Sequence, residues 1–303
     1  MDSQRIADEP PPALDGVEHI HVDLPDVRVH VATAGAGPPV VLLHGWPQNW
    51  WTWRHVIPRL AGDHRVICPD LRGHGWSSAP STGYDKEQLA TDLLGVLDAL
   101  ELDRVGLAGH DWGGFASFLA CLRAPERFRA LLVLNIVHPW QHAVPLHPAS
   151  ALKAIPRLAY QPLLSTPGLG EWVLRTKPSL VARGVGSDAV HRDAFTREDR
   201  ELFGRRLQDP ARAHASSLVY RTWLTREMGP ILRGRYRDKR LEVPTRLLFG
   251  MRDAVVRREW LEGYERYADA MEVVEVPDSG HFIAEERPDL VETHLRELLA
   301  EAA

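Results

Sequence analysis

The chain has 303 residues, of which 44% are hydrophobic and 25% are charged, as expected for one large domain with an insertion or for two small domains. Its formal net charge is −5 and it has no basic block, so nucleic acid is not an expected partner. Both cysteines, Cys68 and Cys121, lie in apolar stretches, and neither a disulfide scaffold, a signal peptide nor a membrane span is predicted. We therefore expect a cytoplasmic protein.

The first half of the chain alternates strand-like and helix-like segments. Apolar runs bounded by turn residues predict strands, and apolar residues at helical spacing predict helices. The predicted strands cover residues 17–22, 27–32, 39–43, 65–68, 104–108 and 131–137. The predicted helices cover residues 51–60, 87–100 and 113–122. Because helices that separate strands act as crossovers, we expect an α/β fold with a mostly parallel sheet and helices on both faces.

The pattern changes after residue 137. Residues 139–240 are rich in proline and arginine and contain no strand-like run. Two helices are predicted there. One begins at the capping-box-like Thr196 and reaches about Leu207, and the other begins at Asp209 and reaches about Arg226. This segment has the character of a helical lid inserted after a strand.

Strand-like runs return at residues 245–249 and 271–276, and a terminal helix is predicted over 289–299. We therefore expect a core of residues 16–137 and 241–303 and a helical lid of residues 138–240.

The motif Gly109-His-Asp-Trp-Gly-Gly114 lies between a predicted strand and a predicted helix. A nucleophile flanked by small residues at such a turn is typical of the nucleophile elbow of the α/β-hydrolase fold. Here the central residue is Asp111 and not a serine. A carboxylate attacks saturated electrophilic carbon and forms an alkyl ester, whereas a serine attacks an acyl carbon. The expected substrates are therefore epoxides or alkyl halides.

Two later residues complete a catalytic triad in the expected chain order. Asp253 follows one late strand and His281 follows the next. We expect His281 to activate the water that hydrolyses the ester on Asp111, and Asp253 to orient the imidazole. Asp278 is a rival acid, but it lies in the histidine's own loop and is typical of a turn residue. Asn135 occupies another place where such folds carry the acid, but it is not a carboxylate.

Two backbone N–H groups are expected to form an oxyanion hole. One belongs to Trp112, directly after the predicted nucleophile, and the other to Trp46, in a turn that follows a buried strand. Each such donor is worth on the order of 3 kcal/mol when charge develops on the ester carbonyl.

Three segments together resemble the α/β-hydrolase-fold epoxide hydrolases: residues 44–54, 70–78 and 109–114. The resemblance runs from about residue 17 to the end of the chain and is thinner in the lid. It implies a cis Trp46-Pro47 bond and two lid tyrosines that hold and protonate the epoxide oxygen. Tyr160, in a Tyr-Gln pair, and Tyr220, in a Tyr-Arg pair, match these tyrosines. Phenols can donate a proton without carrying a charge that would pair with Asp111.

The remaining aromatic residues leave alternatives open. Tyr160 and Tyr220 are also explained as packing residues, since Tyr220 shares a helical face with apolar neighbours. Tyr236 lies among arginines, which indicates a solvated face. The expected substrate pocket is walled by Trp46, Trp112, His138 and Trp140.

The sequence thus predicts a hydrolase that acts on ether bonds and converts epoxides to vicinal diols, with a role in detoxification. Its expected partners are a small apolar epoxide and water, with no metal and no cofactor, and a homodimer is left open. The alternative is a haloalkane or haloacid dehalogenase with the same nucleophile. The tyrosine pair argues against it, as does Trp46, which stands where haloalkane dehalogenases often carry an Asn halide ligand. A third hypothesis is a catalytically silent ligand-binding protein on this fold.

Overall fold

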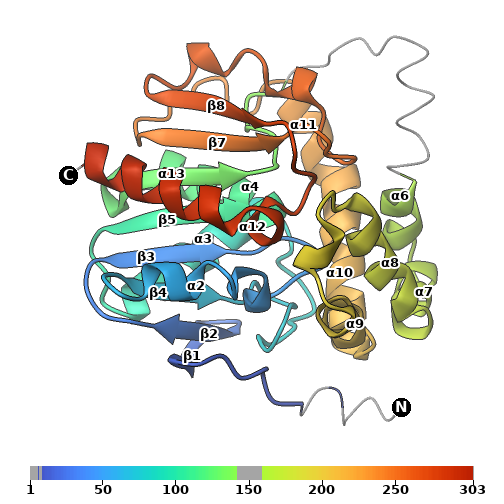
Figure 1. Cartoon of the computed structure of the whole chain (residues 1–303). Coiled ribbons are helices and arrows are strands. Elements are labelled where there is room, and N and C mark those ends of the chain that lie inside the picture. The colour runs from blue at the N-terminus through green and yellow to red at the C-terminus, as the bar shows by residue number, and fades with distance from the viewer. Residues whose placement is uncertain (1–5, 7–8, 142–158, 303) are drawn as a thin grey trace.

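A computed structural model of the chain describes residues 6, 9–141 and 159–302. An eight-stranded sheet forms its centre, in the order β1-β2-β4-β3-β5-β6-β7-β8 (Figure 1). β1 and β2 pair antiparallel, as do β2 and β4, and every later pairing is parallel. The strands are β1 (Val17–Asp23), β2 (Arg28–Ala34), β3 (Pro39–Leu43), β4 (Arg65–Pro69), β5 (Val105–His110), β6 (Phe128–Leu134), β7 (Thr245–Gly250) and β8 (Met271–Val276). The predicted α/β architecture is confirmed.

Helices cover both faces of this sheet, because successive residues of a strand point to opposite sides. In β3, Val41 packs in a cluster that includes residues of α3 (Lys86–Ala99) and α4 (Asp111–Arg123). Its neighbour Leu42 packs in a second cluster that includes residues of α2 (Ile57–Leu60) and α13 (Pro288–Glu301). One cluster lies on each face of the sheet, so the sheet forms the middle of a three-layer core.

Most bounds differ from the predicted ones by one to three residues, and in two predicted elements the difference has a clear local cause. The predicted helix over 51–60 is a 3₁₀ turn, Trp50–Trp53, followed by the short helix α2. Pro58 lacks the N–H that a continuous helix would direct to the carbonyl of Arg54, so the helix restarts at Ile57. β6 ends at Leu134 and not at residue 137, because Asn135 adopts a φ of 47°.

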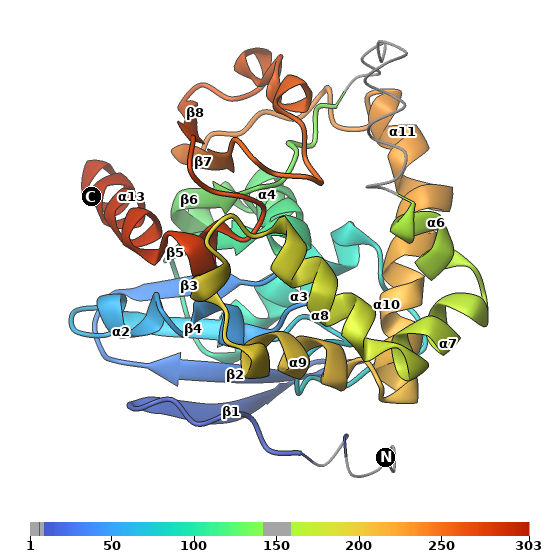
Figure 2. The same ribbon diagram turned by 45° about the vertical axis from the view of Figure 1, so that its right-hand side comes forward.

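Between β6 and β7, the described residues contain helices and no strand. Figures 1 and 2 both place these helices to one side of the sheet. They are α6 (Tyr160–Ser165), α7 (Leu169–Thr176), α8 (Pro178–Asp188), α9 (Arg197–Arg206), α10 (Pro210–Thr222) and α11 (Met228–Leu232), with a π-helical turn at Trp223–Glu227.

The two helices predicted in this region correspond to α9 and α10, and the capping box of Thr196 with Asp199 is present. α6, α7, α8 and α11 were not predicted. The division into a core and a lid at residues 138 and 240 stays a prediction, and residues 142–158 of that lid lie outside the described residues.

Candidate active site

Asp111 follows β5 directly and is the first residue of α4. Its φ of 50° is unusual for a residue with a side chain, and such conformations concentrate at functional sites. Glycines make this turn possible, because a Cβ on Gly113 would collide with the backbone carbonyls of His44 and Leu43. The sharp turn brings α4 against the end of β3 and leaves the carboxylate of Asp111 at the carboxyl end of the sheet.

The two oxygens of the Asp111 carboxylate have different surroundings. Oδ1 accepts a hydrogen bond from the backbone N–H of Trp46 at 2.9 Å. Oδ2 lies 3.7 Å from Nε2 of His281. Burial alone would raise the pKa of Asp111, but the hydrogen bond and charge of His281 and the backbone N–H of Trp112 hold it below its ordinary value. The carboxylate is therefore ionised at neutral pH, as a nucleophile must be.

His281 links the carboxylates of Asp111 and Asp253. Its Nδ1 lies 2.8 Å from Oδ2 of Asp253, and because an ionised carboxylate only accepts hydrogen bonds, Nδ1 carries the proton. Oδ1 of Asp253 accepts the backbone N–H groups of Val255 and Val256 at 2.6 and 2.9 Å. Burial alone would lower the pKa of His281, but Asp253 and Asp111 raise it well above its ordinary value.

Asp278, the rival acid, does not reach the imidazole. Its carboxylate is half exposed and pairs with Arg287 at 2.9 Å. Asp253 alone of the two acids contacts His281, as the chain order predicts.

Asn135 is a site residue whose role the sequence did not reveal. Its side-chain amide donates a hydrogen bond of 2.7 Å to Oδ2 of Asp253, the same oxygen that faces His281. The positive φ of Asn135 at the end of β6 turns the side chain toward the end of β7. Asn135 was considered only as a possible place for the acid, and it instead holds the acid in position.

His110 supports the other side of the imidazole. Burial and the nearby His281 lower the pKa of His110 to about 4, so its ring is neutral. Its Nε2 lies 2.8 Å from the backbone carbonyl of His281 and therefore carries the proton. This hydrogen bond ties the loop of His281 to the strand that precedes the predicted nucleophile.

A cavity of about 420 Å³ opens above Asp111. Its floor includes Trp46, Asp111 and His281, and its walls are mostly apolar side chains of α6, α7 and α8. The wall residues are Leu163, Leu164, Val173, Leu174, Leu180, Val181 and Val185. An apolar wall around one carboxylate and one imidazole suits a small lipophilic ligand.

Three of the predicted pocket residues do not line this cavity. The indole N–H of Trp140 donates to the carbonyl of Lys239 at 3.0 Å, and its ring stacks on Tyr267. His138 is fully buried, with Nε2 3.2 Å from the carbonyl of Glu262. The Trp112 ring lies beneath Lys86, whose Nζ is 4.3 Å from the ring centroid. Only Trp46 of the predicted set lines the cavity.

Tyr160 and Tyr220 lie together next to Trp46. Their rings are 5.5 Å apart, and each also contacts the ring of Trp46, at 5.8 and 5.1 Å. Burial raises the pKa of Tyr160 to about 12 and that of Tyr220 well above its ordinary value. The negative charge of Asp111 adds to the rise of both pKa values. Both hydroxyls are therefore protonated and able to donate at neutral pH.

Tyr236 is not on a solvated face. The residue is buried, and its hydroxyl donates to Oε1 of Glu87 at 2.8 Å. The neighbouring arginines are exposed, but the ring of Tyr236 packs inward with the main core cluster, so the local charge pattern was misleading.

The described residues contain no group of three or more His, Cys, Asp or Glu side chains that could hold a metal ion. In the part of the chain that the structure describes, no helix has both the length and the apolar character to cross a membrane.

Known proteins resemble this chain in sequence and in fold. Residues 38–288 match the family described as the alpha/beta hydrolase fold. The chain is 28% identical to Epoxide hydrolase 3 of Siraitia grosvenorii, covering 94% of this chain and 99% of that protein. It is 30% identical to AB hydrolase superfamily protein YfhM of Bacillus subtilis, covering 94% and 99%. The solved structure of epoxide hydrolase CorEH without ligand superimposes with a TM-score of 0.83 at 28% identity, covering 95% of this chain and 100% of that chain.

The chain therefore belongs to the α/β-hydrolase-fold family. Within that family, its predicted resemblance to the epoxide hydrolases is confirmed.

Proposed function

We propose that this hydrolase opens epoxides to vicinal diols through a covalent ester on Asp111. The proposal rests on one observation: the two oxygens of the Asp111 carboxylate have different surroundings. Trp46 N–H holds Oδ1, while Oδ2 faces His281 and the cavity that Tyr160 lines. Tyr160 and the ionised carboxylate of Asp111 line the same apolar cavity, and the ring of Tyr220 contacts that of Tyr160, so a nucleophile and a proton donor share one space.

In the first step, Oδ2 of Asp111 attacks a ring carbon of the epoxide. The carbon–oxygen bond of the ring breaks, and the new alkoxide takes a proton from Tyr160 or Tyr220. A phenolate is left, and the substrate is bound to Asp111 as a hydroxyalkyl ester. The apolar wall of α6, α7 and α8 excludes bulk water from this step.

In the second step, water attacks the ester carbonyl carbon and gives its proton to Nε2 of His281. The N–H groups of Trp46 and Trp112 stabilise the charge on the carbonyl oxygen. The bond to the diol oxygen then breaks, the leaving oxygen takes the remaining proton of the added water, and Asp111 returns as a carboxylate. The proton held by His281 then restores the tyrosine. One epoxide and one water are consumed and one diol is released.

Ester formation also prepares His281 for its task. In the free enzyme, two carboxylates hold the pKa of His281 high. Esterification removes the charge of Asp111, so the pKa of His281 falls and the neutral imidazole becomes available as a base.

The covalent step is tested by a single turnover of styrene oxide in heavy-oxygen water. The water-derived oxygen should appear in Asp111 and not in the first molecule of diol, and mass spectrometry of the active-site peptide measures this. Asp111→Ala should lose diol formation by at least about 10⁴-fold. Full activity of Asp111→Ala, or heavy oxygen in the diol of the first turnover, would reject the ester.

The second candidate, a dehalogenase, would use the same nucleophile. The observation in its favour is that the buried indole nitrogen of Trp46 has no acceptor among the described residues, which leaves an N–H that a halide accepts. Release of bromide from a bromoalkane, without diol from styrene oxide, would favour it over the epoxide hydrolase.

A further inference from the structure

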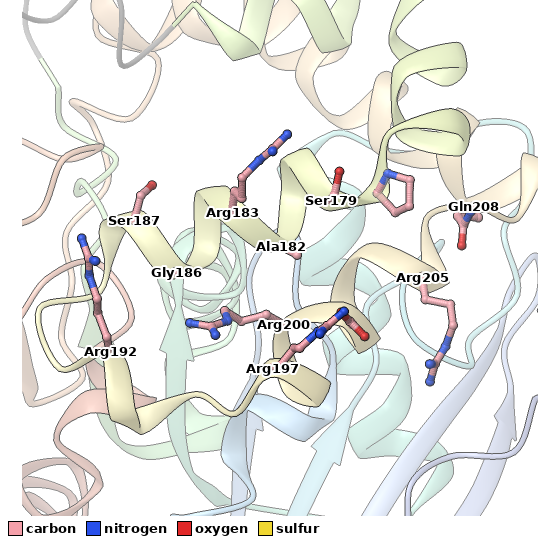
Figure 3. A pocket seen from close by; sticks show the side chains of 12 residues that line it. Ser179, Ala182, Arg183, Gly186, Ser187, Arg192, Arg197, Arg200, Arg205 and Gln208 are labelled. Carbon is pink, nitrogen blue, oxygen red and sulfur yellow. The ribbon is translucent and has the colours of Figure 1, made fainter.

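A second cavity, of about 760 Å³, lies between α8 and α9, away from Asp111 (Figure 3). α8 separates it from the cavity over Asp111. Leu180, Val181, Gly184 and Val185 face the catalytic side, whereas Ser179, Ala182, Arg183 and Gly186 line the second cavity. Each set recurs at helical spacing, so the two cavities lie against two opposite stripes of one helix.

The lining of this second cavity is strongly cationic. It contains five arginines and a single acidic residue, Glu201. Arg197 pairs with Glu201 at 2.6 Å, and Arg205 pairs with Glu9 at 2.8 Å. Two of the five charges are therefore already neutralised. The remaining three belong to Arg183, Arg192 and Arg200.

Those three guanidinium groups form no hydrogen bond or ion pair with any residue that the structure describes. Carboxylates are available close by in the sequence, since Asp193 and Glu198 are exposed, but within the described part of the chain neither pairs with them. Like charges gathered in a concave surface raise the local positive potential, and low-dielectric walls focus it. The cavity therefore attracts anions more strongly than scattered surface arginines would.

The three unpaired arginines are not equally placed with respect to α8. Arg200 crosses α8 where the helix has a glycine, and a Cβ at Gly186 would lie 3.1 Å from both Cδ and Nη1 of Arg200. In Figure 3, Arg192 and Arg200 both extend toward this stretch of α8, whereas Arg183 leaves the helix in another direction. Arg192 and Arg200 are therefore the two unpaired groups directed at one part of the cavity.

We propose that this cavity is a binding site for a small molecule that carries a multivalent oxyanion, either a phosphate or a set of carboxylates. Guanidinium groups bind such oxygens with paired, charge-assisted hydrogen bonds, and the planar fork favours oxyanions over halide ions. The proposal does not depend on the reaction at Asp111, because its readout is binding.

The test is calorimetric titration of the full chain with inorganic pyrophosphate and with citrate, at constant ionic strength set by chloride. Saturable binding of either probe, with a dissociation constant of about 1 mM or tighter, is expected. Tighter binding of pyrophosphate would identify a phosphate-bearing ligand, and tighter binding of citrate a polycarboxylate. Absence of saturable binding of both probes would overturn the proposal.

A matched pair of double variants separates a site from general attraction. Arg192→Gln with Arg200→Gln should weaken binding at least tenfold. Arg226→Gln with Arg237→Gln removes the same charge from exposed arginines elsewhere and should change affinity less than twofold. Equal losses in the two double variants would show that only net charge matters and would overturn the site.

A second matched pair uses two glycines of α8. Gly186→Ala places a methyl group against Arg200 and should weaken binding severalfold, whereas a Cβ at Gly184 meets no atom within 4 Å. Gly186→Ala and Gly184→Ala raise the helix propensity of α8 by the same amount, so a difference in stability would not explain a difference in binding between the two variants. If the Gly186→Ala variant bound the probe as tightly as the wild type, Arg200 would not be part of the site.

Discussion

At the scale of single residues, the site rests on hydrogen bonds that fix the direction of each reacting group. Asn135 and two backbone N–H groups hold Asp253, Asp253 holds His281, and Trp46 N–H holds one oxygen of Asp111. Each bond reduces the freedom of the next group, so the carboxylate and imidazole meet with little reorganisation.

The two tyrosines give the first residue-scale prediction. Tyr160→Phe or Tyr220→Phe should each slow ester formation about 100-fold, and the double variant should abolish it, because the alkoxide then lacks a proton donor. Rapid-quench measurement of the enzyme-bound ester checks this. Tyr264→Phe is the control, since the ring of Tyr264 contacts His138, whereas the rings of Tyr160 and Tyr220 contact Trp46. Unchanged turnover of the double variant would assign both tyrosines to packing.

The second residue-scale prediction concerns the protonation of His281. Because its folded pKa lies above the unfolded value of about 6.5, the protonated imidazole stabilises the fold below that pH. This contribution is lost as the pH rises through the folded pKa. Asp111→Asn should lower the folded pKa of His281, since one of the two carboxylates that raise it is gone.

Nuclear magnetic resonance of the histidine side chains measures this pKa directly. Asp278→Asn removes a carboxylate from the same loop, but its partner is Arg287, so the pKa of His281 should stay within a few tenths. An Asp111→Asn protein whose His281 titrates as in the wild type would contradict the account of how the ester prepares the base.

At the scale of elements, the sequence predicts well those features that depend on a single strand or turn. The chain order of Asp111, Asp253 and His281 could be predicted because Asp111 follows an apolar run directly and the other two lie in the loops that follow later apolar runs. Asn135 was missed because its partner is 118 residues away in the sequence. α7 and α8 were missed because they are short and carry glycines, which weaken the periodic pattern.

A buried ion pair connects α3 to the π-helical turn after α10. Nζ of Lys86 lies 2.9 Å from Oε2 of Glu227, and Oε1 of Glu227 also accepts the backbone N–H of Lys86 at 2.7 Å. Lys86 contacts the ring of Trp112, and that ring contacts Tyr220. The pair therefore anchors α10 and its tyrosine against the helix that begins with Asp111.

Removing one partner of this pair gives the element-scale prediction. Glu227→Gln should lower the free energy of unfolding by about 3 kcal/mol, because it leaves the Lys86 charge buried without a counter-charge. The double variant Lys86→Met with Glu227→Gln should recover part of that loss. Urea denaturation measures both. Equal stability of wild type and Glu227→Gln would show that the pair does not hold α10.

At the scale of the whole molecule, Arg54 joins the helix that follows His281 to α9, which contacts α8. It contacts Glu285 of α12 (Ile283–Glu286), and its Nη2 lies 3.0 Å from Asp199 of α9. The indole of Trp51 also donates to Asp199 at 2.7 Å. Burial raises the pKa of Glu285 to about 8, and the charge of Arg54 opposes that rise.

Arg54→Ala should therefore weaken the whole assembly. It leaves Asp199 without its buried cation and Glu285 without the donor Arg54, and a loss of about 3 kcal/mol or more is expected, with faster hydrogen exchange in α9. Arg59→Ala breaks a more exposed pair with Glu292 and should cost less than about 1 kcal/mol. Exchange in α9 that is the same in both variants would show that Arg54 does not secure this helix.

Because the two Asp111 oxygens have different surroundings, only one of them is expected to be transferred to the diol. Water arriving from the side of His281 would leave its oxygen where Oδ2 had been, because Trp46 N–H keeps Oδ1 in place. That newly installed oxygen would then be the attacking atom of the next cycle. Every diol would thus carry the oxygen of the water consumed one cycle earlier. If the carboxylate were free to rotate between cycles, only half of the diols would carry that oxygen.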